Sequence, residues 1–122
     1  MRQDPGFRGA RAALIATALA FPAVALAHHG WSEYDQTTTL TLTGTIREAG
    51  YEHPHGHIRI ETPGKTWIAV LAPPSRMDSR GLSRDMLKPG AIATVVGYQN
   101  RNKPDEMRAE RITIAGKTVE LR

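Results

Sequence analysis

The amino-acid sequence predicts an all-β domain, and three observations support this prediction. Apolar and polar residues alternate with a period of two along several short segments of the 122-residue chain, as in strands that are buried on one face. Proline and glycine stand together between some of these segments, as they do in turns. Helix-forming residues of the domain are concentrated in one stretch, residues 72–90, which separates the third expected strand from the fourth.

The first strand is expected in TLTLTGTI, residues 39–46. Its alternation directs Leu40, Leu42 and Ile46 to one face and the threonines to the other. Gly44 stands where the apolar series would continue, so a bend or a bulge is expected at this glycine.

The second and third strands complete a meander. HIRIET, residues 57–62, directs Ile58 and Ile60 inward. TPGK, residues 62–65, supplies the proline and glycine of a tight turn. The third strand is then expected in TWIAVL, residues 66–71.

After residues 72–90 the alternation resumes. Within that stretch Ser83 is the expected N-cap of a short helix, and Pro89 and Gly90 end it. The later strands are expected in AIATVVGY (residues 91–98), MRAERITI (107–114) and the short AGKTVEL (115–121). Three strands, a connection with a helix and two more strands are the order of a small OB-fold-like antiparallel barrel. The other interpretation is a different small antiparallel sheet or sandwich.

The N-terminal segment has the layout of a secretory signal peptide. Arginines at positions 2, 8 and 11 precede an apolar run over residues 12–21, and Ala25-Leu26-Ala27 supplies small residues before a cleavage point. We expect a signal-peptide helix over residues 1–27 and a single barrel domain over residues 28–122. The mature domain would be periplasmic or secreted, with no transmembrane segment, because no second long apolar run follows.

Composition narrows the class of function. The formal charge of +4 falls to +2 once the three arginines and one aspartate of the leader are removed, which gives little reason to expect a nucleic-acid partner. The chain contains no cysteine, so core packing alone must stabilise the domain. We do not expect an enzyme, because no nucleophile and base set and no glycine-rich phosphate loop is recognisable.

Four segments carry a family resemblance. They are AHHGWSEYD (residues 27–35), HPHGHI (53–58), WIAVLAPPSR (67–76) and RGLSRDMLKPG (80–90). Together they resemble a family of small secreted bacterial proteins of unknown function. The resemblance implies export and an OB-like barrel, and it implies no activity.

All five histidines fall in two short clusters. His53, His55 and His57 alternate in HPHGH, and side chains two residues apart in an extended chain share one face, about 6.6–7 Å from each other. Two imidazoles in this arrangement can converge on one metal ion. The other cluster is His28 and His29, where cleavage after residue 27 would give His28 a free α-amine as an additional nitrogen ligand.

We therefore predict an exported OB-like binding module. His28, His29, His53, His55 and His57 would bind Cu(II) or Zn(II) for metal capture or delivery, since nitrogen ligands suit these ions. No other cofactor is expected. The alternative is a structural or protein-interaction module with an unknown periplasmic partner, in which the same histidines only shape a loop.

Three arginines are spaced four residues apart, at Arg76, Arg80 and Arg84. On one continuous helix they would form a basic stripe that could contact an anion. Gly81 and the expected cap at Ser83 interrupt that helix, so a solvated face is the favoured interpretation.

Overall fold

The computed structural model describes residue 6 and residues 30–122. The expected leader, apart from residue 6, lies outside the described residues, as do His28 and His29. Among the residues that are described, no helix is long and apolar enough to cross a membrane.

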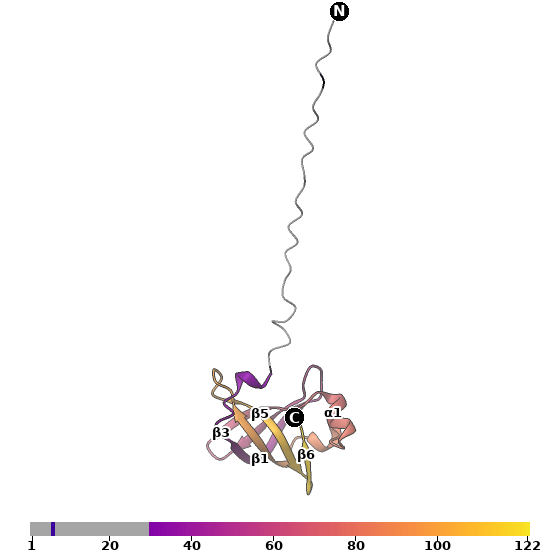
Figure 1. Ribbon diagram of the computed structural model, residues 1–122. Coiled ribbons are helices and arrows are strands. Elements are labelled where there is room, and N and C mark those ends of the chain that lie inside the picture. The colour runs from indigo at the N-terminus through magenta and orange to yellow at the C-terminus, as the bar shows by residue number, and fades with distance from the viewer. Residues whose placement is uncertain (1–5, 7–29) are drawn as a thin grey trace, which may run out of the picture.

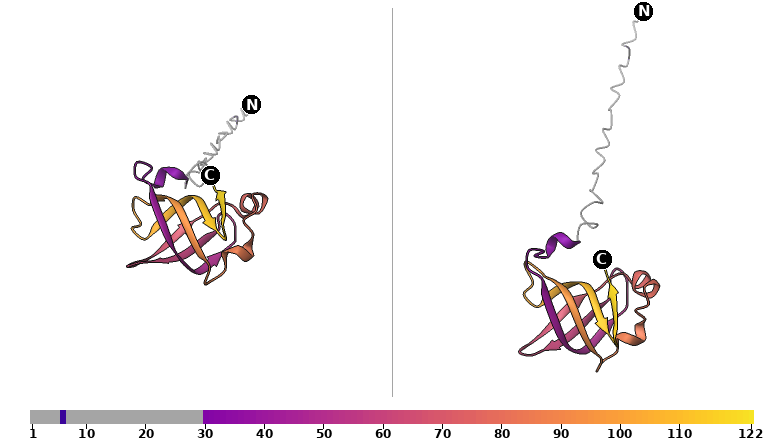
Figure 2. Two further views of the ribbon diagram at one scale, coloured as in Figure 1. Left: turned by 90° about the horizontal axis from the view of Figure 1, so that it is seen from below. Right: turned by 60° about the horizontal axis from the view of Figure 1, so that its bottom comes forward.

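The described chain folds into a closed five-stranded barrel, as predicted (Figure 1). The sheet order is β3-β2-β1-β4-β5-β6, and a parallel pairing of β3 with β5 closes the barrel. Figure 2 shows the same strands wrapping around one axis from two further directions. The strands are β1 (Leu40–Gly50), β2 (His57–Thr62), β3 (Lys65–Val70), β4 (Ile92–Gln99), β5 (Glu106–Ile114) and β6 (Lys117–Glu120).

The barrel interior is filled by the apolar positions of the alternating pattern. Ile58 and Ile60 of β2 are fully buried, as predicted, and so is Ile46 of β1. Leu40 and Leu42 are only partly buried and pack against the edge of this core. The alternation in the sequence therefore reports correctly which face of each strand points inward.

The connection between β3 and β4 contains two short helical segments. The helix α1 (Pro74–Ser79) places Met77 in the core, and the 3-10 helix η3 (Arg84–Leu87) places Leu87 there. The predicted N-cap, Ser83, precedes η3, but its side chain makes no capping hydrogen bond. The helix between the third and fourth strands is thus confirmed, while α1 begins earlier than the Ser83 signal indicated.

The bulge of β1 is not at Gly44. Gly44 pairs regularly with Ala93 of β4, and the register shift lies between Ile46 and Glu48. Gly44 is required for a different reason, because a Cβ atom there would overlap the backbone carbonyl of Glu61 in β2. A glycine inside a strand can mark a close approach of another backbone as well as a bulge.

Gly97 of β4 gives a test of this close packing. A Cβ atom at Gly97 would overlap the backbone of Arg108 in β5, so we expect Gly97→Ala to lower the free energy of unfolding by about 3 kcal/mol. Urea unfolding followed by circular dichroism measures this loss. Gly30→Ala is the control, because its Cβ would meet no atom within 4 Å and should change stability by less than about 0.5 kcal/mol. Equal effects of the two substitutions would contradict the prediction.

Candidate functional site

The loop between β1 and β2 carries the three clustered histidines. Its backbone extends the β2–β3 ladder, because the Gly56 N–H donates to the Ala72 carbonyl (2.9 Å) and the Leu71 N–H donates to the Gly56 carbonyl (2.8 Å). The chain is therefore extended up to β2, which directs His55 and His57 to the outside of the barrel. This part of the sequence prediction is confirmed.

The three imidazoles have different surroundings. The ring of His57 lies against Gly50 of β1, where a Cβ atom would overlap it. His55 is half-buried, whereas His53 is exposed and lines a hollow beside Tyr51. In the described part of the chain, no group of three or more histidine, cysteine, aspartate or glutamate side chains is placed to hold a metal ion. The loop alone therefore does not assemble a three-ligand site.

His28 and His29 lie outside the described residues, but the point at which the chain reaches the barrel is well defined. Trp31 begins the 3-10 helix η2 (Trp31–Glu33), and its ring contacts two guanidinium groups. The Cζ atoms of Arg108 and Arg122 lie 4.7 Å and 4.5 Å from the ring centroid. The ring also meets Tyr98 edge-on at 6.1 Å. In Figures 1 and 2, η2 lies beside the C-terminus at one end of the barrel.

One lateral row of paired residues connects the histidine loop with this end of β5. Gly50, His57, Val70 and Arg108 are successive partners across β1, β2, β3 and β5. Neighbouring strands are about 4.8 Å apart, so the backbones of His57 and Arg108 lie about 10 Å apart. The N-terminal segment is consequently held close to the histidine loop.

Arg108 is the most unusual charged residue of this row. It is only 5% exposed, and its Nε atom is buried without a hydrogen-bond partner. Burial lowers the pKa of the Arg108 guanidinium, and the positive charges of Arg76 and Arg122 add to this effect, while Tyr34 and Glu106 partly offset it. Within the part of the chain that the structure describes, the outer face of β5 thus carries a guanidinium without an ion-pair partner beside Trp31.

The same charges act on His55. Burial lowers the pKa of the His55 imidazole, and the charges of Arg108 and Arg76 lower it further. The ring is therefore unprotonated near neutral pH, with a nitrogen lone pair available to a hydrogen-bond donor or to a metal.

A buried clamp attaches the N-terminal segment to the barrel. Tyr34 pairs with Asn100 as an isolated bridge, and its hydroxyl donates to Glu106 Oε2 at 2.9 Å. Asn100 Nδ2 donates to the same oxygen at 2.8 Å, and the Asp35 N–H donates to the Gln99 carbonyl at 2.8 Å. Tyr34 and Asp35 thereby fix this segment to the barrel.

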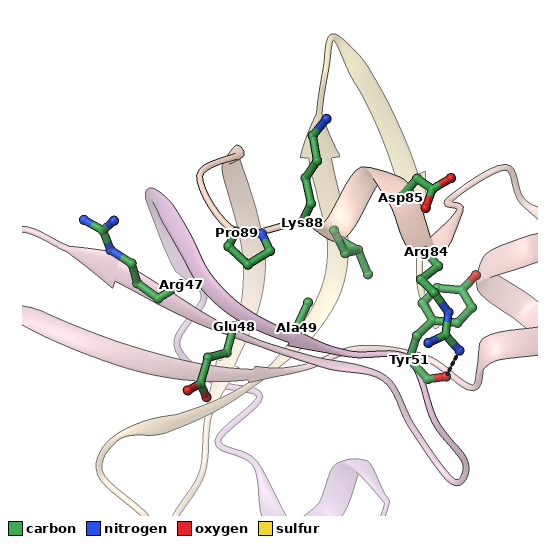
Figure 3. A pocket seen from close by; sticks show the side chains of 9 residues that line it. Arg47, Glu48, Ala49, Tyr51, Arg84, Asp85, Lys88 and Pro89 are labelled. Atoms are coloured by element: carbon green, nitrogen blue, oxygen red, sulfur yellow. Dashed lines mark hydrogen bonds between the residues drawn. The ribbon is translucent and has the colours of Figure 1, made fainter.

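A groove runs between the end of β1 and η3 (Figure 3). Arg84 lies over the ring of Tyr51, with Cζ 5.3 Å from the centroid, and donates to the Tyr51 carbonyl at 3.2 Å. Lys88 and Asp85 line the groove with opposite charges. This mixture of charges indicates no particular class of ligand.

Arg76 and Arg80 do not form part of a continuous basic stripe. Arg76 Nη1 donates to the carbonyl of Leu121 at 3.1 Å. Arg80 Nη1 donates to the carbonyls of Glu120 at 2.7 Å and Arg122 at 3.1 Å. The third arginine of this spacing, Arg84, lines the groove instead. Two of the three arginines thus fix the C-terminal residues to α1.

Sequence reasoning missed Arg108. It lies in the predicted strand MRAERITI, where the alternation places it between the inward-facing Met107 and Ala109. The outward direction could be read from that pattern. Its burial could not, because the covering ring, Trp31, comes from the opposite end of the domain.

Comparison with protein families gives one match. The sequence model described as "Family of unknown function (DUF6152)" matches residues 15–107. No curated protein matches the chain.

Comparison with solved structures supports the fold. The chain resembles the S. pombe Stn1-ten1 complex with a TM-score of 0.52 and 15% identity, over 65% of this chain and 59% of that one. It also resembles TiaS in its complex with tRNA and ATP, with a TM-score of 0.49 and 23% identity over 73% of this chain and 20% of that one. A ZRD-deleted TiaS mutant in complex with agmatine gives a TM-score of 0.49 and 22% identity, over 72% of this chain and 25% of that one. The chain spans less than two thirds of each of these proteins, and the likeness to the Stn1-ten1 complex shows the fold alone.

The pKa of His55 tests the electrostatic coupling in this site. We expect Arg108→Gln to raise the pKa of His55 towards its ordinary value, because one of the nearby positive charges is removed. An NMR titration of the imidazole resonances measures the change. Arg111→Gln, which removes an exposed arginine paired with Glu120, should leave the titration of His55 unchanged. An unaltered His55 titration in Arg108→Gln would contradict the coupling.

Tyr34 tests the clamp. Burial raises the pKa of Tyr34 to about 12, and the hydrogen bond to Glu106 adds to the effect. Because the folded state holds this proton more tightly than the unfolded state, Tyr34 stabilises the fold fully below pH about 10, and this contribution is lost as pH rises towards 12. Tyrosinate absorbance should include one transition near pH 12 that is absent in Tyr34→Phe. If Tyr34→Phe removed an ordinary transition near pH 10 instead, the clamp would not hold the hydroxyl.

Proposed function

Because the chain belongs to DUF6152, a family of unknown function, its membership assigns no activity, and we propose one from the site: an exported OB-like module that binds Cu(II) or Zn(II). The proposed ligands are His55 and His57 together with the α-amine and imidazole of His28 and the imidazole of His29. His53 would be an outlying member of the set. In this proposal the protein captures or delivers the metal and catalyses no reaction.

The anchoring of Trp31 is the observation that carries the proposal. Its ring is held against Arg108, which shares a lateral row with His57 about 10 Å away. His28 precedes Trp31 by three residues, and three residues span at most about 10 Å. A mature N-terminus at His28 could therefore reach the imidazoles of the loop.

The electrostatic surroundings of His55 act in two directions. A lowered pKa keeps the imidazole unprotonated, as metal ligation requires. The same arginine charges repel a cation, so the α-amine and the other imidazoles would have to supply most of the affinity. The order of affinity among divalent ions favours Cu(II) for such a nitrogen-only set.

Export is supported by the leader layout of residues 1–27 and is part of the proposal. A free amine at His28 exists only if the leader is removed before this residue. The site would then form after export and remain incomplete in the unprocessed chain.

The test is a titration of the processed protein beginning at His28 with Cu(II) and Zn(II), measured by isothermal titration calorimetry. Two further forms carry one extra N-terminal residue or the pair His55→Ala/His57→Ala. We expect each of them to bind at least about tenfold more weakly, because each loses one part of the ligand set. Glu52→Ala, an exposed neighbour in the same loop, is the matched control and should bind as the unmodified protein does.

Two additional measurements sharpen this test. Binding should weaken as pH falls below about 6, where free histidine becomes protonated. Arg76→Gln should strengthen metal binding, because it removes a charge that repels the ion and leaves the contact between Arg108 and Trp31 in place. Equal and weak uptake by every form would overturn the proposal and favour the alternative, a protein-interaction module whose histidines shape the loop.

A further inference from the structure

The side chain of Arg108 carries a charge with which no carboxylate of the described residues forms an ion pair. The nearest acidic side chain of its strand, Glu106, already accepts hydrogen bonds from Tyr34 and Asn100. The next, Glu110, accepts one from the Tyr98 hydroxyl. Among residues 30–122, the Arg108 guanidinium forms neither a hydrogen bond nor an ion pair, and its Nε atom is completely covered.

The charges around Arg108 act in both directions, because Tyr34 and Glu106 favour its charged form while Arg76 and Arg122 oppose it. Arg76 of α1 and Arg122 at the C-terminus both lie close enough to affect it electrostatically. Arg122 has Glu110 as an ion-pair partner at 3.6 Å, whereas Arg76 has only the carbonyl of Leu121. Among residues 30–122, Arg76 and Arg108 are therefore two guanidinium groups that have no ion-pair partner and that interact electrostatically with each other.

Such an arrangement is costly in an isolated protein. A buried charge without a partner loses its hydration and gains little in return, so buried guanidinium groups are nearly always paired. An anion bound between the two arginines would compensate for the hydration that their positive charges have lost. Guanidinium groups bind carboxylate and phosphate oxygens in a bidentate manner, which gives these ligands an advantage over a spherical anion.

The position of Trp31 determines which part of Arg108 is available. The tryptophan ring lies against the guanidinium at 4.7 Å from Cζ, in a cation–π contact. The N–H groups of a guanidinium lie in its own plane, so those that the tryptophan ring does not cover can donate to a ligand at the edge.

We propose that Arg108 and Arg76 form a binding site for a small oxyanion, a carboxylate or a phosphate group, on the outer face of β5 beside Trp31. Neither arginine is one of the proposed metal ligands, although the charges of both act on His55. Its ligand is recognised by the planar arrangement of two oxygen atoms and by negative charge.

The experiment uses protein expressed as the whole chain and purified in the form that the cell yields, in chloride buffer with EDTA so that no metal contributes. Sodium phosphate and sodium acetate are titrated separately at constant ionic strength. The side-chain Nε–Hε resonance of Arg108 is followed by NMR. We expect a saturable shift for at least one anion, and the arm with the tighter binding identifies phosphate or carboxylate as the ligand.

Variants separate this site from general charge attraction. Arg108→Gln should weaken binding at least about tenfold, since charge-assisted hydrogen bonds are lost, and Arg76→Gln should weaken it to a smaller extent. Arg108→Lys keeps the charge but loses the bidentate geometry, so it should also bind more weakly. Arg111→Gln is the matched control on the same strand and should bind as the unmodified protein does.

The melting temperature gives a second readout that does not require NMR. The saturating anion should raise the melting temperature of the unmodified protein and leave that of Arg108→Gln unchanged, because only the former binds it. Without the anion, Arg108→Gln should be at least as stable as the unmodified protein. Unchanged binding in Arg108→Gln, or no saturable shift with either anion, would overturn the proposal. If the substitutions at Arg108 and Arg76 changed metal uptake but did not change anion binding, the proposal would be overturned too.

Discussion

The parallel pairing of β3 with β5 is the constraint on which the rest of the structure depends. Ile68, Ala69 and Val70 pair with Glu106, Met107 and Arg108, and without these pairs the sheet would stay open with two exposed edges. Closure encloses the isoleucine core. Closure also places His57 and Arg108 in one lateral row of paired residues. The pairing that closes the barrel therefore also brings the parts of the candidate site together.

Most of the fold could be predicted because its signals are local. The inward direction of Ile58 and Ile60 follows from alternation within six residues, and the Pro63-Gly64 turn follows from two adjacent residues. Gly44 shows the limit of such reasoning. Its role depends on how closely β2 crosses β1, which alternation along one strand does not report.

The candidate site was predictable only in its local part. The outward direction of His55 and His57 follows from the extended chain, but the surroundings of their rings depend on Gly50 and on arginines from other elements. Arg108 was missed because its burial depends on Trp31, at the other end of the domain. Long-range contacts decide the electrostatics here, and the sequence pattern contains no record of them.

The hydrogen bonds that Arg76 and Arg80 donate to the C-terminal carbonyls have a consequence for association between copies of the protein. Among the strands of the described residues, β6 pairs with β5 alone and is an edge strand. Carbonyl groups along such an edge attract strands from other molecules and can begin fibril growth. At Glu120, Leu121 and Arg122 these groups are already occupied by guanidinium donors, which leaves a second chain fewer acceptors there. The arginines that secure the end of the barrel thus also protect it against edge-to-edge aggregation.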